Sequence, residues 1–386
     1  MKIRIIKPKL HFYMVAVLLS FVECLDYRLY QITNNYMFYI AVIVILLDFF
    51  LIRKINTGGM SLLFFSVFYF IAINISQGGI AIGIRYAIIF VSIYLFERIE
   101  FTPNFWKLGI YMGVLFFLRY FLRAENYLTE FERQSNFYGG VNYVNIINVN
   151  VPCFMVFVCL IFLILYCKIK KIPREKLITL IGTILSVLMS YRLDCRVTIY
   201  TSILVYICME IIPISFFYIR NRVLLMVTLL FLVGCIFPFI VVIYSSSNAS
   251  EIFTGRELIW SNYMSILSGN PESIFLGLGT NYRTAVSLSG LTMHNSFLEM
   301  AFNFGFIGVF LYWLTAFKTI KAAFDKGITE NQCYLIIAYM VMLVFGYINT
   351  AIQREYLFIF FSMFLGLSNN QLYGRRNREN KFEIEK

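Results

Sequence analysis

The sequence predicts an all-α protein that is held in a membrane by about twelve transmembrane helices. Of its 386 residues, 60% are hydrophobic and only 14% are charged, and the mean hydropathy is +0.75. A soluble domain is about 45–50% apolar and about 25% charged, so this composition excludes a soluble enzyme. A bilayer core about 30 Å thick needs roughly 20 apolar residues per helix, and apolar runs of this kind recur along the whole chain.

The apolar runs define the predicted spans in chain order. They cover 10–25, 36–52, 60–76, 79–96, 104–122, 146–167, 177–191, 196–217, 223–245, 291–317, 332–349 and 355–369. The basic segment Met1–Lys9 is not followed by a small-residue cleavage site, so it predicts a retained anchor and not a removed signal peptide. We therefore expect a single integral membrane domain over 1–386.

The placement of lysine predicts how the chain is oriented. When the N-terminus is placed in the cytoplasm, every lysine falls on the cytoplasmic side, in the N-terminal segment, the tail 370–386 or alternate loops: Arg53/Lys54, Arg98/Lys107, Lys168–Lys176, Arg220/Arg222 and Lys318–Lys326. Cytoplasmic loops carry an excess of basic residues. The expected topology is therefore multi-pass in the cytoplasmic (plasma) membrane, with both termini and the charged tail 370–386 in the cytoplasm.

The net charge of +12 has the same explanation, so we expect no nucleic-acid partner. The eight cysteines include no C-x-x-C pair and mostly fall in apolar runs, and the chain has only two histidines. Cysteines in this setting behave as small apolar residues. The sequence therefore predicts no metal site and no cofactor.

The cations that this topology leaves outside or within the membrane are all arginines. A guanidinium binds phosphate or carboxylate through two parallel hydrogen bonds, whereas lysine acts as a point charge. One interpretation is that topology merely excludes lysine from these loops. Arg85 favours a functional interpretation, because it lies about two turns inside the fourth span, where an ionisable group faces a polar cavity or a partner.

The long loop 246–290 is predicted to be external and to contain a short amphipathic helix at the membrane interface. Thr254 and Glu257 have the spacing of a capping box, an apolar stretch with Trp260 follows, and Gly269-Asn270-Pro271 ends the helix. Arg256 falls in the first turn, where free backbone N–H groups favour an anion. The alternative is that Arg256 is a solvated residue paired with Glu257.

Where the chain re-enters the membrane, His294 stands beside Asn295, with Glu299 about one turn further on. On a continuous helix, His294, Leu298, Ala301, Gly305 and Gly308 share one face, and the glycines allow a neighbouring helix to approach closely. His294 is then at the outer mouth of the span. The alternative is that His294 has only a structural role, and its polar neighbours argue against this.

A third cluster, Ser190–Arg196, forms the predicted external turn between spans seven and eight. It contains Arg192, Asp194 and Arg196. Two interpretations are open: a salt-bridged turn, or half of an anion clamp that other external arginines complete.

Together these residues resemble the O-antigen ligase/polymerase superfamily, which includes lipopolysaccharide O-antigen ligases and Wzy-type polysaccharide polymerases. The resemblance rests on G-R-x-x-x-W from Gly255 to Trp260, N-P at Asn270-Pro271, G-x-G at Gly277 and Gly279, and H-N-x-F-L-E from His294. It is strongest over 254–308. Members often carry Ser-Arg where this chain has Cys195-Arg196, so the arginine is kept and the serine is missing.

The resemblance implies a metal-independent, GT-C-like glycosyltransferase that polymerises polyprenyl diphosphate-linked repeat units into capsular polysaccharide, exopolysaccharide or O-antigen on the outer face of the membrane. His294 would be the catalytic base, and the arginines Arg85, Arg192, Arg196 and Arg256 would bind the diphosphate. Glu257, Trp260, Asn295 and Glu299 would support them. The implied partners are undecaprenyl diphosphate-linked donor and acceptor glycans, membrane lipids, a flippase and a chain-length regulator.

Three alternatives remain open on the sequence. A ligase of the same superfamily transfers the glycan to another acceptor. A lipid-linked oligosaccharide flippase or other transporter is disfavoured, because no matching pair of Gly/Pro-broken spans marks two repeated halves. A scaffold without catalysis does not explain the external arginines and His294.

Overall fold

The computed structural model describes residues 12–25, 43, 47, 60–76, 80–99, 101, 103–122, 150–193, 195–244, 256–269, 273–279, 295–347 and 358–370. All regular elements within these ranges are helical. The first half contains α1 (Phe12–Leu25), α4 (Met60–Ser76), α5 (Ile80–Phe96), η1 (Pro103–Trp106), α6 (Lys107–Phe116), the π-helix η2 (Phe117–Phe121), α8 (Asn150–Lys170) and α9 (Glu175–Arg192). The second half contains α10 (Arg196–Tyr206), the π-helix η3 (Ile207–Ile211), η4 (Ile214–Tyr218), α11 (Arg220–Tyr244), α13 (Arg256–Gly269), α14 (Ser273–Leu276), α16 (Ser296–Asp325), α17 (Glu330–Phe345) and α18 (Phe358–Ser368).

The helical class predicted from the sequence is confirmed for the described residues. Every predicted span coincides with at least one helix, except 36–52, which lies almost entirely outside the described residues. Three described helices are long and apolar enough to cross a membrane, namely Pro152–Lys170, Arg220–Tyr244 and Ser296–Asp325. These apolar helices indicate a membrane protein, while the full count of about twelve spans stays a prediction.

Helix α9 is polar on the side that faces α10 and aliphatic on its outer side. The side of α9 that faces α10 is polar, since Thr179, Thr183, Ser186 and Ser190 are all buried, and the Ser186 and Ser202 hydroxyls lie 2.8 Å apart. The outer side carries exposed aliphatic residues: Leu177, Leu180, Ile181, Ile184, Leu185 and Leu188. Small polar residues between helices and aliphatic residues outside are typical of helices packed in lipid.

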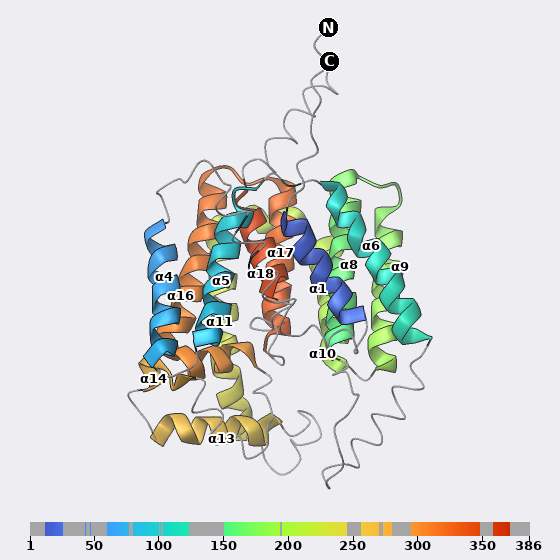
Figure 1. The fold of residues 1–386 in the computed structure, drawn as a ribbon. Coiled ribbons are helices and arrows are strands. Elements are labelled where there is room, and N and C mark those ends of the chain that lie inside the picture. The colour runs from blue at the N-terminus through green and yellow to red at the C-terminus, as the bar shows by residue number, and fades with distance from the viewer. Residues whose placement is uncertain are drawn as a thin grey trace.

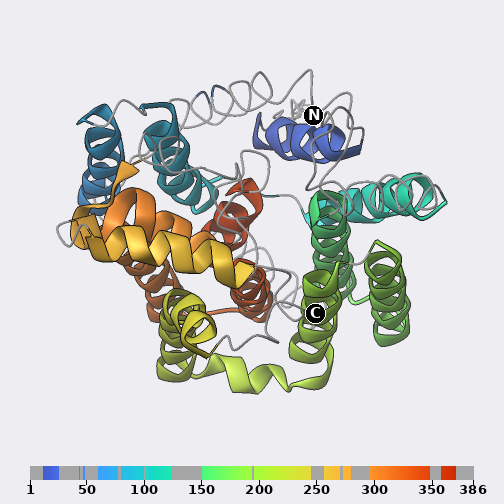
Figure 2. The ribbon, with the colours of Figure 1, turned by 90° about the horizontal axis from the view of Figure 1, so that it is seen from below.

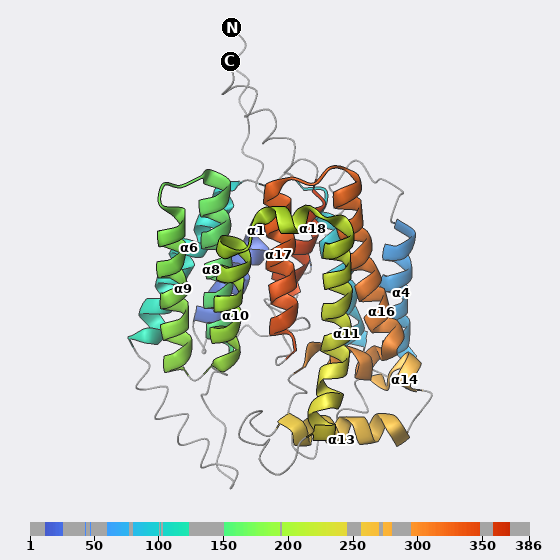
Figure 3. The same cartoon turned by 180° about the vertical axis from the view of Figure 1, so that it is seen from behind.

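The helices form two groups with α17 and α18 between them (Figures 1 and 3). One group contains α6, α8, α9 and α10, and the other contains α4, α5, α11 and α16. α17 contacts α8, α10 and α11, while α18 contacts α5, α16 and α17. Because almost every residue of α17 and α18 is buried and apolar, this pair forms the centre of the core.

The two ends of the bundle differ in the charges that they carry. At one end, which we call the lysine end, lie 97–99, η1 and the connections 171–174, 207–219 and 326–329 (Figures 1 and 3). The opposite end, which we call the α13 end, contains α13, α14, the end of α9, the start of α10 and the first turn of α16. All lysines in the described part lie in helix ends and connections at the lysine end, so the predicted segregation of lysine agrees with the arrangement of the helices.

Candidate functional site

Helix α13 lies across the α13 end of the bundle, roughly perpendicular to the other helices (Figures 1 and 2). Trp260 is fully buried and packs in a small cluster with Val241 of α11 and with Leu298 and Phe302 of α16. The rings of Tyr263 and Phe302 meet edge to face at 5.0 Å between centroids. The predicted helix and its apolar anchor at Trp260 are therefore present, with an end at Gly269 as expected from Gly269-Asn270-Pro271.

The first turn of α13 faces the bundle and carries two charges. Arg256 is partly buried, and Glu257 is buried. Neither carboxylate oxygen of Glu257 has a hydrogen-bond partner in the described part of the chain. Burial lowers the pKa of the Arg256 guanidinium, and its electrostatic interactions with Cys195 and Glu257 act in the opposite direction. Arg256 nevertheless stays charged at every physiological pH, because an arginine pKa starts so high.

The effect of Cys195 on Arg256 shows that the start of α13 lies close to the turn between α9 and α10. Arg192 is the last residue of α9, and its guanidinium lies 5.1 Å from the ring centre of Phe121. Arg196 is the exposed first residue of α10, directly after buried Cys195. The structure thus brings three of the four predicted diphosphate-binding arginines, Arg192, Arg196 and Arg256, to one end of the bundle.

The fourth predicted arginine, Arg85, is on a different side of the bundle. It belongs to α5, which Figure 2 shows across the bundle from α9 and α10. Arg85 is half-buried next to Tyr86, whose ring stacks against that of Phe70 on α4 and meets that of Phe304 on α16. Arg85 therefore lies on a helix that packs against α4 and α18, whereas the other three arginines lie on α9, α10 and α13.

The predicted catalytic residue, His294, lies outside the described residues, as do Thr254 and Asp194. The predicted helical face that begins at His294 is wrong. Helix α16 starts at Ser296, after Asn295 as its N-cap, and Gly305 interrupts it with φ 65° and ψ −177°. An uninterrupted face from His294 to Gly308 therefore does not exist.

Asn295 has a clear structural role. Its side-chain oxygen accepts a hydrogen bond from the Leu298 N–H at 2.7 Å, which is the usual way that an N-cap satisfies a free helix donor. Its side-chain amide donates to the Tyr347 carbonyl at 2.7 Å. Asn295 thus joins the start of α16 to the end of α17.

The kink at Gly305 makes room for α14. A Cβ at Gly305 would collide with the Phe275 carbonyl, and a Cβ at Gly277 would collide with the backbone of Asn303. The carbonyls near the kink have partners outside the helix: the Leu278 N–H donates to Phe302 O at 2.7 Å, and the Tyr69 hydroxyl donates to Phe304 O at 2.8 Å. The G-x-G segment at Gly277 and Gly279 therefore has a defined structural purpose.

Sequence reasoning did not select Asn303, although it stands one turn after Glu299 on α16. Both residues are buried. Neither side-chain atom of Asn303, Oδ1 or Nδ2, has a hydrogen-bond partner in the described residues. Buried polar groups are nearly always hydrogen-bonded, so such exceptions need a reason. The sequence signal that points to Asn303 is an amide in the middle of an apolar run, four residues after the carboxylate of Glu299.

Taken together, the α13 end carries three arginines and the buried polar side chains of Glu257 and Asn303. No protein-family model matches the chain, and no curated protein matches it either.

Proposed function

We propose that this protein is a membrane glycosyltransferase that polymerises polyprenyl diphosphate-linked glycan repeat units at the outer face of the plasma membrane. In this proposal the chain has about twelve spans, both termini lie in the cytoplasm, and the α13 end faces outward. The observation that carries the proposal is the gathering of Arg192, Arg196 and Arg256 at an end without lysine, next to the buried carboxylate of Glu257.

The reaction needs positive charge on the leaving group and a base near the nucleophile. A hydroxyl oxygen of the acceptor sugar attacks the anomeric carbon of the donor, and the bond from that carbon to the diphosphate oxygen breaks. The arginines bind the diphosphate as its negative charge develops, because donors placed in advance stabilise such charge most effectively. His294 takes the proton from the attacking hydroxyl. No metal ion is required in this scheme.

The buried polar residues serve the glycan in this proposal. Glu257 offers carboxylate oxygens that accept hydrogen bonds from sugar hydroxyl groups, and the amide of Asn303 both donates and accepts. Asn295 positions the backbone before α16, Trp260 holds α13 against the bundle, and Glu299 lies beside Asn303 on the same helix. Arg85 is proposed as a separate contact to the lipid-linked substrate, because its helix lies across the bundle.

The test uses membranes that contain the protein and outward-facing lipid-linked repeat units. We expect the wild-type protein to lengthen these units, and His294→Ala to leave single units at a normal protein level, with a loss of roughly 10²–10⁴-fold in rate. Because a base must be unprotonated, the wild-type rate should fall as the pH drops below about 6.5, the ordinary pKa of histidine.

Two outcomes separate the alternatives. A ligase moves existing chains to another acceptor and does not lengthen them, and a flippase changes the side on which the units lie without changing their length. In the His294→Gln variant the side chain keeps a hydrogen bond but takes no proton, so normal chain length in that variant would mean that His294 only orients the acceptor. Normal chain length in His294→Ala would remove His294 from the mechanism.

A further inference from the structure

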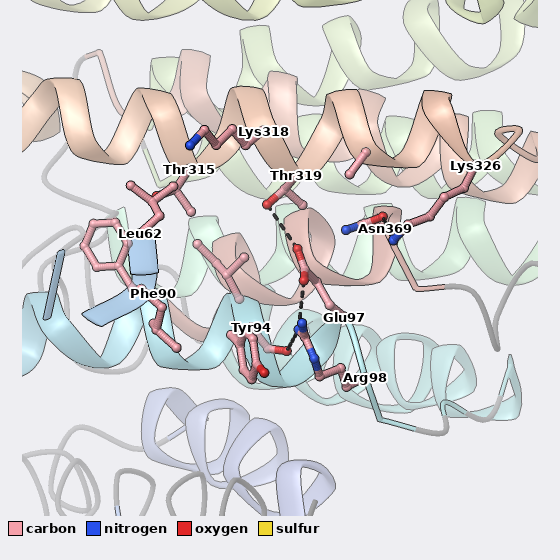
Figure 4. Close-up of a pocket in the computed structure, with 13 residues that line it drawn as sticks. Leu62, Phe90, Tyr94, Glu97, Arg98, Thr315, Lys318, Thr319, Lys326 and Asn369 are labelled. Carbon is pink, nitrogen blue, oxygen red and sulfur yellow. Dashed lines mark hydrogen bonds and ion pairs between the residues drawn. The ribbon is translucent and has the colours of Figure 1, made fainter. Parts of the chain in front are cut away.

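A cavity of about 380 Å³ lies at the lysine end, away from the proposed reaction site (Figure 4). Its main walls are one face of α5 and one face of α16. The residues of α5 are Phe90, Ile93 and Tyr94, followed by Glu97 and Arg98 just after its end, and those of α16 are Thr315, Lys318, Thr319 and Ala322, followed by its C-cap Lys326. Leu62 and Leu63 of α4 and Asn369, just after α18, complete the lining. Both faces follow the three-and-four spacing of a helix.

The lining combines apolar and charged residues. Figure 4 shows Leu62, Phe90 and Lys318 towards one end of the cavity, and Arg98, Lys326 and Asn369 towards the other. On the side of α5, the apolar residues Phe90 and Ile93 come before the charged pair Glu97 and Arg98, which lies nearer the lysine end. Along this wall the cavity therefore becomes more polar in the same direction as a membrane leaflet does.

The charges in the lining leave a positive excess. The lining contains three basic residues and one acidic residue, Glu97. The Glu97 carboxylate accepts hydrogen bonds from Arg98 at 2.9 Å and from the Thr319 hydroxyl at 3.1 Å. Lys326 donates to the Asn369 side chain at 3.0 Å, a neutral partner. Lys318 is exposed and has no hydrogen-bond or ion-pair partner in the described part of the chain.

We propose that this cavity binds an anionic phospholipid of the membrane leaflet at the lysine end. The phosphate is attracted by the three cations of the lining, Arg98, Lys318 and Lys326, and one acyl chain lies along Leu62, Leu63 and Phe90. Basic pockets between membrane helices suit anionic headgroups in this way. The cavity volume is at the lower end of the range for ligand sites, about 300–1,000 Å³, so it holds the headgroup and the first part of a chain.

The test measures lipid binding and does not depend on the proposed enzyme activity. Dioleoyl-phosphatidylglycerol, dioleoyl-phosphatidylcholine or glycerol 1-phosphate is added to the full-length protein in a neutral detergent. Binding is measured by native mass spectrometry and by the shift of the unfolding midpoint. We expect phosphatidylglycerol to bind more tightly than phosphatidylcholine, and glycerol 1-phosphate to have no effect. Equal binding of the two lipids would overturn the proposal, and so would glycerol 1-phosphate binding as tightly as phosphatidylglycerol.

Two matched lysines locate the site. Lys318→Gln should weaken phosphatidylglycerol binding about fivefold, the scale of one basic residue at an anionic lipid surface. Lys321→Gln is the control, because Lys321 is also exposed on α16 but does not line the cavity. Ala322→Phe, which fills part of the cavity, should weaken the same binding without lowering the unfolding midpoint in detergent alone. Equal effects of Lys318→Gln and Lys321→Gln would show a general surface attraction and refute a site.

Discussion

The two ends of the bundle handle buried charge in different ways. At the lysine end, Lys168 lies 2.6 Å from Glu210 and 2.9 Å from Glu175, and Arg98 lies 2.9 Å from Glu97. At the α13 end, the buried carboxylate of Glu257 and the buried amide of Asn303 have no hydrogen-bond partners among the described residues. The buried carboxylate of Glu210 is therefore held in an ion pair through one of its oxygens, whereas neither oxygen of the Glu257 carboxylate has a hydrogen-bond partner in the described part of the chain.

This difference bears on function because a buried polar group without a hydrogen bond costs about 1–3 kcal/mol. Such a loss of stability is expected at functional sites, because activity there requires polar groups that apolar residues would replace in a more stable protein. The α13 end has this character and also holds Arg192, Arg196 and Arg256.

The first prediction decides which end faces outward, and its effect is all or none. Ser265 is exposed on α13, and Ile172 lies in the connection between α8 and α9 at the lysine end. In intact cells, an impermeant thiol reagent should label Ser265→Cys, while Ile172→Cys should react only after permeabilisation. A cysteine at position 380, which lies outside the described residues, should behave like Ile172→Cys. If Ser265→Cys required permeabilisation, the α13 end would be cytoplasmic and the proposed external reaction would be wrong.

The second prediction contrasts the cations of the two ends. Arg256→Lys keeps the positive charge but loses the planar pair of donors, so polymerisation should fall on the order of 10²-fold, the scale for loss of one preorganised donor. Arg196→Ala should also lose most of the activity. Lys318→Arg at the lysine end should leave chain length unchanged. Long-chain product in both Arg256→Lys and Arg196→Ala would show that the diphosphate site lies elsewhere.

The sequence predicted these features to different extents. The bounds of α13 followed from local signals, namely the spacing around Trp260 and the stop at Gly269-Asn270-Pro271. The collection of Arg192, Arg196 and Arg256 at one end followed from the absence of lysine in alternate loops. The first inference depends on residues close together in the chain, and the second on the alternation of loops along it, so neither needs contacts between distant side chains.

The features that escaped prediction depend on contacts between distant segments. The Asn295 cap is secured by Tyr347, more than 50 residues away, and the kink at Gly305 exists because α14 occupies the space beside it. A glycine inside an apolar run is compatible with a straight helix, so the run 291–317 gave no sign of the break. The place of Arg85 across the bundle follows from helix packing, which periodicity alone does not determine.

The third prediction tests the junction that shapes the α13 end. In Gly305→Ala the new methyl group meets the Phe275 carbonyl at a positive φ, so the free energy of unfolding should fall by roughly 3 kcal/mol or more, since strain and a collision add. Gly269→Ala is the control, because a Cβ there has no neighbour within 4 Å, and it should change the unfolding midpoint little. Equal midpoints for the two variants would show that α14 does not pack against the kink.

The fourth prediction compares two buried asparagines on the same helix and has the smallest effect on stability. Asn295→Ala removes the cap of α16 and leaves the Tyr347 carbonyl without its 2.7 Å donor, so the free energy of unfolding should fall by about 1–3 kcal/mol. Asn303→Leu loses no hydrogen bond to a described residue and keeps the same branched side-chain shape, so the unfolding midpoint should stay the same or rise. If the Asn303 amide binds the glycan, however, the same variant should make shorter chains, because the sugar hydroxyl groups lose their partner. A large loss of stability in Asn303→Leu would assign that residue to the packing of α16 and would leave Glu257 as the remaining buried group of the α13 end available to the substrate.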